Sequence, residues 1–384
     1  MKNVKVGIIG TGFIGPAHIE ALRRLGFVDI IALADINLEV AKQKADLFNI
    51  KKYYGDYKKL LEDNEIQSVH ICTPNFLHYE IAKNSLLAGK HVICEKPLAI
   101  SIEEGKELVE IARREKLVNV VNFNLRFYPL IHHLKKMIDN DELGNILAIN
   151  GSYLQDWLLY DTDFNWRLLK EYSGNSRAVA DIGSHWMDLI EFVTGVKIKS
   201  VFADFATFHT KRKKPIKESE TFAGKIENLS GYEEIEITTE DYATVLLRFT
   251  NGAHGSLTVN QAAAGRKNRL YFEIYGSKKG VAWNSERPNQ LWIGERDNHN
   301  GILMKDPSLV DKYAREIISY PGGHIEGFPD TIKQMFGKVY KYILNESYLK
   351  NEKEDFPTFY DGLREIYVCE AILQSAKNNV WIHI

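Results

Sequence analysis

The chain has 384 residues, 45% of them hydrophobic and 26% charged, which is long enough for two or three domains with substantial cores. Lys and Arg together number 49 and Asp and Glu 51, so no basic field favours a nucleic-acid partner. No uncharged apolar run reaches the roughly 18 to 20 residues of a membrane span. Cys72, Cys94 and Cys369 lack metal-ligand spacing, and we expect buried thiols in a reducing compartment. The sequence therefore predicts a cytoplasmic protein with no metal, membrane or nucleic-acid partner.

A glycine-rich motif follows the first apolar run of the chain. Residues 4–9 are rich in β-branched side chains, and Gly10, Gly12 and Gly15 follow with GxGxxG spacing before a helical pattern. A second apolar run ends at Asp35, 20 residues after Gly15, where a dinucleotide-binding fold places the carboxylate that holds the ribose hydroxyls. This context favours a dinucleotide site over an ordinary tight turn. It predicts NAD rather than NADP, because Asp35 would repel a 2′-phosphate.

Strand-like and helical patterns then alternate as far as residue 123. This alternation predicts a doubly wound parallel sheet, and ligands of such sheets lie beyond the carboxyl ends of the strands. The rule points to three segments, which are 10–15, 73–75 and 95–97. Lys96 in the last segment is either a functional amine at the ligand edge or part of a surface salt bridge.

The pattern changes after Asn124 to longer runs of alternating apolar and polar residues. These runs are 146–154, 199–208, 243–249, 255–260, 269–275 and 281–283. They predict a mainly antiparallel sheet in an α+β domain. We therefore divide the chain into an α/β domain at 1–123 and an α+β domain at 124–384. The charged stretch 211–240 indicates a solvated excursion between strands.

Asp181 and His185 are four residues apart in a helical pattern that ends at Gly195. On one helix face, a carboxylate can fix the imidazole tautomer while the other ring nitrogen faces a cleft. The alternative is a helix-capping Asp beside a structural His. Spacing alone does not decide between the two.

Taken together, these features resemble the Gfo/Idh/MocA oxidoreductases, the family of glucose-fructose oxidoreductase and inositol dehydrogenase. The resemblance covers essentially the whole chain. It is carried by the glycine motif, Asp35, Thr73-Pro74-Asn75 with His78, Glu95-Lys96-Pro97, Asn124 with Arg126-Phe127 and Pro129, and Asp181-x-x-x-His185 with Asp188. It implies an N-terminal Rossmann domain, and a C-terminal sheet through which dimers or tetramers assemble.

The resemblance also implies roles for individual residues. Lys96 would orient the reacting hydroxyl, His185 would be the general base and Asp181 would support it, which suits removal of a hydride together with an O–H proton. The implied NAD-binding residues are Gly10, Gly12, Phe13, Ile14, Gly15, Asp35, Thr73, Pro74, Asn75, His78, Glu95, Lys96, Asn124, Trp166 and Arg167.

Three further segments, 151–157, 164–167 and 321–327, resemble a sugar-active branch of the family. Aromatic rings next to polar groups suit a polyol. The expected substrate-binding residues are Lys96, Arg126, Tyr153, Gln155, Trp157, Asp181, His185 and His324, and Trp166 is a further pocket candidate. We predict an NAD-dependent dehydrogenase of a neutral sugar, glycoside, anhydrosugar or cyclitol. An NAD-dependent glycoside hydrolase and a non-catalytic regulator that senses sugar or dinucleotide remain as alternatives.

Overall fold

The computed structural model describes residues 3–216 and 231–384. They form two compact units. The first comprises the chain up to Asn124 together with Pro329–Ile366, and the second comprises Leu125–Phe328 with Tyr367–Ile384. Each unit is described by itself.

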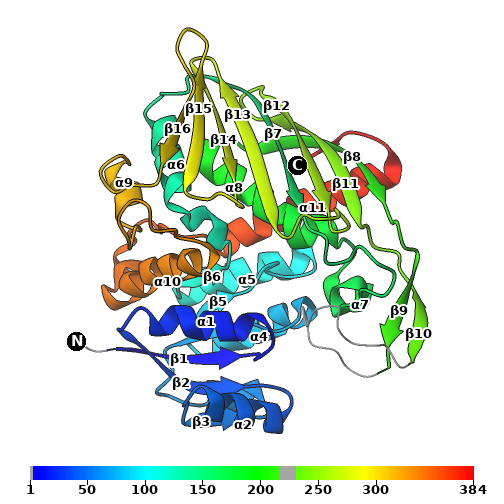
Figure 1. Ribbon diagram of the computed structural model, residues 1–384. Helices are drawn as coiled ribbons and strands as arrows, with labels where there is room; N and C mark the ends of the chain where they lie inside the picture. The colour runs from blue at the N-terminus through cyan, green and yellow to red at the C-terminus, as the bar shows by residue number, and fades with distance from the viewer. Residues whose placement is uncertain (1–2, 217–230) are drawn as a thin grey trace. The chain divides into compact units, whose positions relative to one another are not determined.

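The first unit contains a six-stranded parallel sheet with the strand order β3-β2-β1-β4-β5-β6 (Figure 1). All residues of β4 and β5 are buried, as expected for the central strands of a sheet that helices cover on both faces. This arrangement confirms the predicted doubly wound sheet. Its strands are β1 Val4–Ile9, β2 Val28–Ala34, β3 Lys52–Tyr54, β4 Ser68–Ile71, β5 His91–Cys94 and β6 Asn119–Val121. Its helices are α1 Ile14–Arg23, α2 Leu38–Leu47, α3 Tyr57–Leu61, η1 Asn75–Leu77, α4 His78–Leu87, α5 Ile102–Glu115, α10 Phe328–Leu344 and η5 Ser347–Lys350.

The division of the chain differs from the predicted one in its C-terminal part. Residues 329–366, which we had expected in the α+β domain, lie in the first unit. Helix α10 packs there through Phe336 and Tyr340, which are fully buried. The ring of Phe336 lies against His18 and His70, with ring centroids 4.9 and 4.8 Å apart. Neighbours so distant along the chain leave no local pattern that a sequence reading could detect.

The second unit is built on a nine-stranded sheet with the order β16-β15-β14-β13-β7-β12-β11-β8-β17. Its neighbouring strands are antiparallel except for the parallel pair β7 and β12, which confirms the predicted mainly antiparallel sheet. Its strands are β7 Ile146–Leu154, β8 Ile198–Ala206, β11 Tyr242–Phe249, β12 His254–Asn260, β13 Arg269–Gly276, β14 Lys279–Asn284, β15 Gln290–Glu295, β16 Gly301–Met304 and β17 Ile382–His383. Its helices are η2 Asn124–Phe127, α6 Pro129–Asp139, η3 Trp166–Leu168, α7 Lys170–Ser173, the π-helix η4 Val179–Gly183, α8 Ser184–Thr194 and α9 Lys312–Arg315. Helix α11 Phe359–Asn378 belongs to the first unit as far as Ile366 and to the second from Tyr367.

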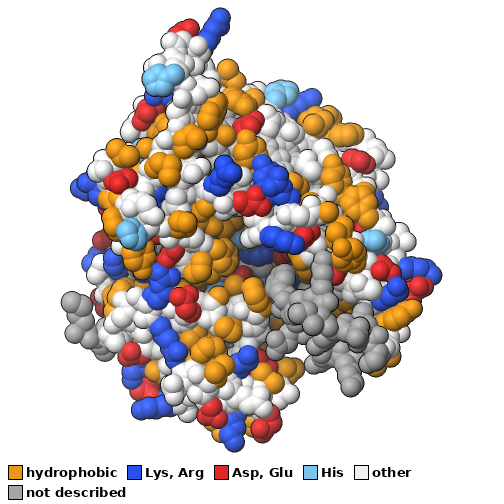
Figure 2. Space-filling view, viewed as in Figure 1, with side chains coloured by type: hydrophobic (Ala, Val, Ile, Leu, Met, Phe, Trp, Pro, Cys, Tyr) orange, Lys and Arg blue, Asp and Glu red, His pale blue; other side chains and the backbone are white. Residues whose placement is uncertain are grey.

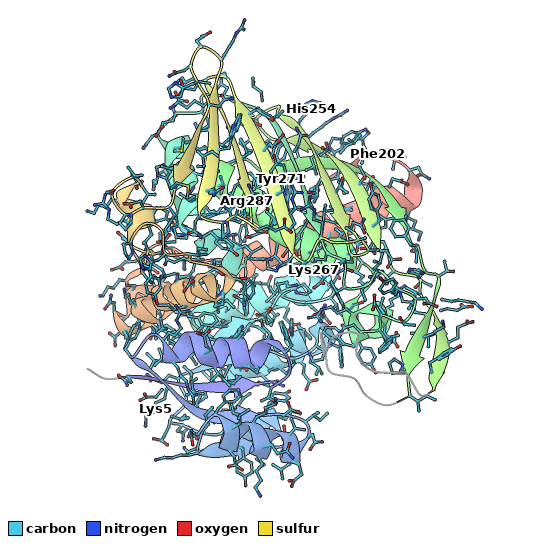
Figure 3. The ribbon with its side chains drawn as sticks, in the orientation of Figure 1. Lys5, Phe202, His254, Lys267, Tyr271 and Arg287 are labelled. Atoms are coloured by element: carbon cyan, nitrogen blue, oxygen red, sulfur yellow. The ribbon has the colours of Figure 1, made fainter. Side chains whose placement is uncertain are left out.

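The two faces of this sheet differ in burial. On β13, Leu270, Phe272 and Ile274 are fully buried, whereas Tyr271 and Glu273 alternate with them on the outer face. Figure 3 shows Tyr271 in front of the strands, and Figure 2 shows apolar side chains interspersed with charged ones over this sheet. The inner face therefore holds the core, and the outer face remains half-exposed.

A glycine in β7 allows helix α8 to lie close to the sheet. The indole Nε1 of Trp186 donates to the carbonyl oxygen of Tyr271 at 3.0 Å. A Cβ at Gly151 would lie 2.4 Å from that Nε1 and 2.3 Å from that oxygen, far inside van der Waals contact. The absence of a side chain at Gly151 therefore lets the Trp186 indole lie against the sheet. This contact positions the first turn of α8, which carries His185.

The charged stretch 211–240 is not simply a solvated excursion. Strands β9 Lys211–Pro215 and β10 Tyr232–Glu236 pair as a two-stranded antiparallel sheet, and residues 217–230 lie outside the described residues. Arg212 is fully buried, and its Nη2 donates to Asp241 Oδ1 at 2.9 Å. The interpretation was wrong for this residue, because a carboxylate 29 positions away along the chain pairs with a charge that a local reading assigns to solvent.

Two observations bear on the environment of the protein. None of the three cysteines is in a disulfide; Cys72 and Cys94 are buried and Cys369 is half-buried. Burial raises the pKa values of the Cys72 and Cys94 thiols well above the usual range for cysteine. In residues 3–216 and 231–384, no helix combines the length and the apolarity needed to cross a bilayer.

Candidate active site

The glycine motif forms a tight turn between β1 and α1. Gly10 has φ +90°, and a Cβ on it would lie 2.7 Å from the backbone of Cys72. A Cβ on Gly15 would lie 2.6 Å from the carbonyl oxygen of Gly10. A Cβ on Gly12 would meet no protein atom within 4 Å, so the open space beside this residue is available to a ligand. Phe13 lies just before Ile14, the first residue of α1, and is exposed.

Asp35 lies directly after β2 and is held by this turn. Its Oδ2 accepts hydrogen bonds from the backbone N and the hydroxyl of Thr11, at 3.1 and 2.6 Å. Its Oδ1 accepts from the backbone N of Asn37 at 3.2 Å. The carboxylate is thus oriented beside the glycine turn, where the sequence predicts the ribose site.

The segments that follow β4 and β5 are joined through His78. Its Nε2 lies 2.9 Å from the carbonyl oxygen of Thr73, and its Nδ1 lies 2.7 Å from that of Pro97. His78 is fully buried, and this burial lowers the pKa of its imidazole. The ring is enclosed and both its nitrogens face protein carbonyls, so the predicted role of His78 toward the cofactor stays a prediction that these bonds make an indirect one. Pro74 and Asn75 begin the η1 turn at the strand end, as predicted.

Glu95 and Asn124 are also enclosed by protein. Glu95 Oε1 accepts from Asn122 Nδ2 and lies 2.9 Å from His18 Nε2. Its Oε2 accepts from the backbone N of Lys96 at 3.3 Å. Burial acts to raise the pKa of Glu95, but the bonds and charges of its neighbours outweigh this effect and hold the pKa at about 2. Asn124 Nδ2 donates to the hydroxyl of Thr331 at 2.6 Å. Both residues thus support the strand ends from within, and a contact of Glu95 or Asn124 with the cofactor stays a prediction.

A chain of buried hydrogen bonds continues behind Glu95. His18 Nδ1 lies 2.9 Å from His70 Nδ1, and His70 Nε2 lies 2.6 Å from the hydroxyl of Tyr340. That hydroxyl also lies 3.2 Å from the hydroxyl of Ser68. Burial and the neighbouring His18 lower the pKa of His70 well below its usual range, so this imidazole is neutral. The network ties the Lys96 strand end to α1, β4 and α10.

In the second unit, Asp181 lies in a π-helical turn just before α8. No side-chain hydrogen bond caps the N-terminus of this turn, and none caps the N-terminus of α8. Instead, Asp181 Oδ2 accepts from Gln261 Nε2 at 2.9 Å, and its Oδ1 lies 3.5 Å from Arg167 Nε. The helix-cap alternative for Asp181 is therefore wrong. Single π-turns occur frequently at functional sites.

His185 begins α8 together with Ser184 and is buried. The ring of Tyr153, from β7, has its centroid 6.4 Å from that of His185. Burial is the main reason why the pKa of Tyr153 lies above its usual range, and the charge of Asp181 raises it further. Asp181, His185 and Tyr153 thus belong to one small group of titratable side chains.

The second unit also holds further predicted site residues, of which Arg167 contacts Asp181. Gln155 Oε1 accepts from the Trp157 indole at 2.7 Å, and its Nε2 donates to Asn268 Oδ1 at 2.9 Å. The guanidinium carbon of Arg167 lies 4.4 Å from the ring of Trp166. Gln155 and Trp157 therefore form a fixed pair, and Arg167 is oriented by both Trp166 and Asp181.

Arg126, a predicted substrate-binding residue, is paired with a carboxylate of its own unit. It is buried, with its Nε donating to Asp188 Oδ2 at 2.8 Å and its Nη2 donating to Asp188 Oδ1. This bidentate pair ties η2 to α8. The guanidinium is bound to a carboxylate of its own unit, and a substrate contact of Arg126 stays a prediction.

His324 lies exposed in a loop that is shaped by a buried ion pair. Lys305 Nζ donates to Glu326 Oε2 at 2.8 Å, and both side chains are about 1% exposed. The same Nζ donates to the carbonyl oxygens of His324 and Tyr320, at 2.8 and 3.1 Å. The loop that carries His324 is therefore held from inside the protein.

The residues that the sequence reading missed are those that support the predicted ones. In the first unit they are His18, His70, Asn122 and Tyr340; in the second they are Arg177, Asp241, Gln261 and Lys305. The available signal was a polar side chain within an otherwise apolar pattern, such as His70 within β4. That signal marks a buried polar residue without naming its partner.

Comparison with known proteins identifies the family. Residues 4–123 match the model of the Gfo/Idh/MocA oxidoreductase family with an NAD-binding Rossmann fold, and residues 131–282 match the C-terminal domain of the same family. The levoglucosan dehydrogenase of Pseudarthrobacter phenanthrenivorans is 30% identical over 100% of this chain and 99% of its own. The chain belongs to the Gfo/Idh/MocA family.

Two other relatives extend this finding. The glucose-6-phosphate 3-dehydrogenase of Bacillus subtilis is 25% identical over 98% of this chain and 97% of its own. A solved levoglucosan dehydrogenase in complex with NADH and L-sorbose superposes with a TM-score of 0.88 at 29% identity, over 100% of this chain and 99% of that one.

The first unit of this Gfo/Idh/MocA protein has the features that an NAD site requires. The turn at Gly10 and Gly15 excludes a Cβ, whereas Gly12 leaves space for a pyrophosphate beside the start of α1. Asp35 presents a carboxylate at the end of β2. The buried hydroxyl of Thr73 has no hydrogen-bond partner among the described residues. These residues fit the dinucleotide.

The buried network predicts a pH dependence of stability. His70 is neutral in the folded protein but takes up a proton near pH 6.5 when unfolded, so the unfolded state binds more protons below that pH and stability falls as the pH falls. A group of this kind costs up to about 1.4 kcal/mol per pH unit. We expect the free energy of unfolding to decrease from pH 7 to pH 5.

The His70→Gln variant should lose stability less steeply over the same range, because an amide does not titrate there. Urea denaturation at pH 7, 6 and 5 would measure both slopes. His254→Gln, at an exposed position in β12, is the matched control and should keep the parent slope. Equal slopes for the parent and His70→Gln would contradict a neutral His70.

Proposed function

We propose that this protein is an NAD-dependent dehydrogenase that oxidises a secondary hydroxyl of a neutral sugar, glycoside, anhydrosugar or cyclitol. The observation that carries the proposal is the group formed by Asp181, His185 and Tyr153, with Asp181 accepting from Gln261 at 2.9 Å. Such a group suits a general base. A relative named for levoglucosan supports the neutral class, whereas the one named for glucose 6-phosphate supports a sugar substrate only.

Each catalytic residue has a proposed task. NAD, when bound, supplies the hydride acceptor. His185 takes the proton of the reacting hydroxyl, and Asp181 favours the imidazolium that results. Lys96 donates a hydrogen bond to the hydroxyl oxygen and stabilises the negative charge that develops there. Its backbone is held at the end of β5 by Glu95.

The charges of the second unit favour a neutral substrate. A phosphate group calls for cations that are free to bind it bidentately. Here Arg126 pairs with Asp188, Lys305 with Glu326 and Lys267 with Asp156. The pairs of Arg126 and Lys305 are buried, so recruiting either cation for a phosphate would break a buried pair.

Tyr153, Gln155, Trp157, Trp166 and His324 are the proposed sugar-contacting residues. Indole and phenol rings can pack on the C–H faces of a sugar, and amides and imidazoles can bond its hydroxyls. Arg167 and Trp166 are proposed to lie at the nicotinamide end. Gly10, Gly12, Phe13, Ile14, Gly15, Thr73, Pro74 and Asn75 are proposed to hold the rest of NAD.

We further propose that the protein assembles as a homodimer or homotetramer through the outer face of the nine-stranded sheet. Strand register places Phe202, Leu246 and Ser256 in one row across this face, and Trp292 and Ile302 in the same row at its other end. Leu246 is 46% and Ile302 60% exposed, and exposed apolar side chains at both ends of the row favour association, although the polar Ser256, Asn150 and Glu273 lie between them. The reduced thiols support a cytoplasmic location.

A substrate panel tests the proposed function directly. Monosaccharides, inositols, methyl glycosides, levoglucosan and glucose 6-phosphate would be assayed with NAD by the absorbance of NADH. We expect net NADH formation with at least one neutral polyol and the highest kcat/KM within that class. Preference for the phosphate ester would refute the neutral class, and glycoside cleavage without net NADH would indicate the hydrolase alternative.

Substitution of the catalytic residues should lower turnover. Lys96→Met and His185→Ala should each reduce kcat by at least about 100-fold, the low end of acid–base contributions, with little change in NAD affinity. Lys59→Met and His254→Ala, at surface positions, are the matched controls. In the parent, oxidation should rise with pH through an ionisation near neutrality. Near-normal turnover in either variant would remove that residue from the mechanism.

Cofactor preference should depend on Asp35. A 2′-phosphate about 4 Å from this carboxylate is repelled by roughly 4 kcal/mol at an effective dielectric constant of about 20, before salt and relaxation reduce it. A residual penalty of about 1.4 to 2.8 kcal/mol gives about 10- to 100-fold preference for NAD. Asp35→Ser should lower the ratio of kcat/KM with NAD to kcat/KM with NADP, whereas Asp46→Ser, in α2, should leave this ratio unchanged. Equal use of both cofactors by the parent would show that Asp35 is not the selector.

A further inference from the structure

Asp181 is the end of a buried chain of polar residues in the second unit. Its Oδ2 accepts from Gln261 Nε2 at 2.9 Å, and Gln261 Oε1 accepts from Arg177 Nη1 at 2.8 Å. Gln261 directly follows β12, and both Gln261 and Arg177 are at most 1% exposed. None of the chemistry assigned so far uses Gln261 or Arg177.

Arg177 is fixed at the far end of this chain. Its Nη2 donates to Asp241 Oδ1, and its Nε donates to the hydroxyl of Thr239 at 3.2 Å. Asp241 in turn accepts from Arg212 Nη2 at 2.9 Å and from the backbone N of Phe208 at 2.7 Å. A guanidinium that binds buried partners through three nitrogens cannot rotate without leaving a charge unpaired.

The chemistry of Arg177 determines which way the amide of Gln261 faces. A guanidinium has donors only, so the Gln261 oxygen must face Arg177 and the NH₂ group must face Asp181. Gln261 therefore always presents a donor to Asp181, and donors favour the ionised form of a carboxylate. Arg167 faces the other oxygen of Asp181 at 3.5 Å.

We propose that Gln261, oriented by Arg177, is a positioning residue that holds Asp181 as the ionised partner of His185. The proposal rests on the proposed function for its kinetic consequences. The titratable and charged groups around Asp181 include Tyr153 on β7 and Arg167 on η3. Gln261 itself has no contact with the reacting atoms in this proposal; it acts through Asp181.

Two substitutions at position 261 separate a positioning role from a merely structural one. Gln261→Glu keeps the shape and the acceptor for Arg177. It replaces the donor by a carboxyl group that can donate to Asp181 only while protonated. Gln261→Met keeps the volume and removes the donor altogether. Gln374→Glu and Gln374→Met, at an exposed site in α11, are the matched controls.

The first measurement does not depend on activity. Selective histidine labelling and NMR would follow the titration of the His185 ring in the full-length protein, with His185→Gln for assignment. We expect its midpoint to move by at least about half a pH unit in Gln261→Glu and not in Gln374→Glu, since a charge placed within hydrogen-bond distance of Asp181 changes the field at His185. An unchanged midpoint in a folded Gln261→Glu protein would overturn the proposal.

The second measurement uses the preferred substrate from the panel. The Gln261→Glu profile of kcat against pH should show an added fall as pH rises, because deprotonation of the introduced carboxyl group puts two carboxylates together. Gln261→Met should lower kcat about tenfold at every pH, a part of the roughly 10²- to 10⁴-fold that acid–base catalysis supplies, with the Kd for NAD unchanged.

The outcomes distinguish the two proposals from each other. A parent without dehydrogenase activity on any polyol would refute the proposed function and leave the His185 titration as the test of Gln261. If the parent is active and kcat depends on pH in the same way in the parent and in Gln261→Glu, the role of Gln261 is refuted and the proposed function is not. Thermal unfolding of each variant reports whether it folds, and if Gln261→Met does not, the isosteric Gln261→Glu still decides the question.

Discussion

A carboxylate that leaves water needs hydrogen-bond donors around it, and this requirement arranges the polar interior of both units. In the first unit, Glu95 is surrounded by His18, Asn122 and the backbone of Lys96. In the second, Asp241 accepts from two fully buried arginines. A buried charge without such partners would be strongly destabilising. The donors therefore connect strands and helices that lie far apart along the chain, and these connections fix the elements that carry Lys96 and Asp181.

Rigid support of this kind suits the proposed chemistry. Proton transfer to His185 requires heavy atoms within hydrogen-bond reach, and small displacements of a catalytic group are costly. The π-turn places Asp181 beside Gln261, and the close approach at Gly151 fixes the turn of α8 that carries His185. The Asp181–Gln261 contact and the close approach at Gly151 both support the imidazole of His185 without being part of it. The precision of the site thus depends on residues that contact no substrate.

Local patterns were sufficient to predict the fold and to propose the residues that carry chemistry, but they did not reveal the supports of those residues. The glycine motif, the run ending at Asp35 and the alternating strands each report on neighbours a few residues away, and the structure confirms the two sheets that they predict. The return of residues 329–366 to the first unit and the Arg126–Asp188 pair depend on contacts between distant segments. The burial of Arg212 within a run of four basic residues shows the same limit. Charge runs predict solvent exposure only when no distant partner exists, and a single sequence does not reveal that partner.

The two units satisfy their buried carboxylates by different chemistry, and the difference has a consequence for proton movement. The chain from Glu95 passes through imidazoles and a phenol hydroxyl, each of which can donate or accept. The ionised Glu95 only accepts, so His18 Nε2 donates to it, and the donors of this chain are ordered from Tyr340 through His70 and His18 toward Glu95. The chain from Asp181 ends at a guanidinium, which donates only, and it therefore has a single direction. An amide and a guanidinium do not relay protons, so a proton that His185 takes up in the proposed reaction is not passed along the Gln261 side.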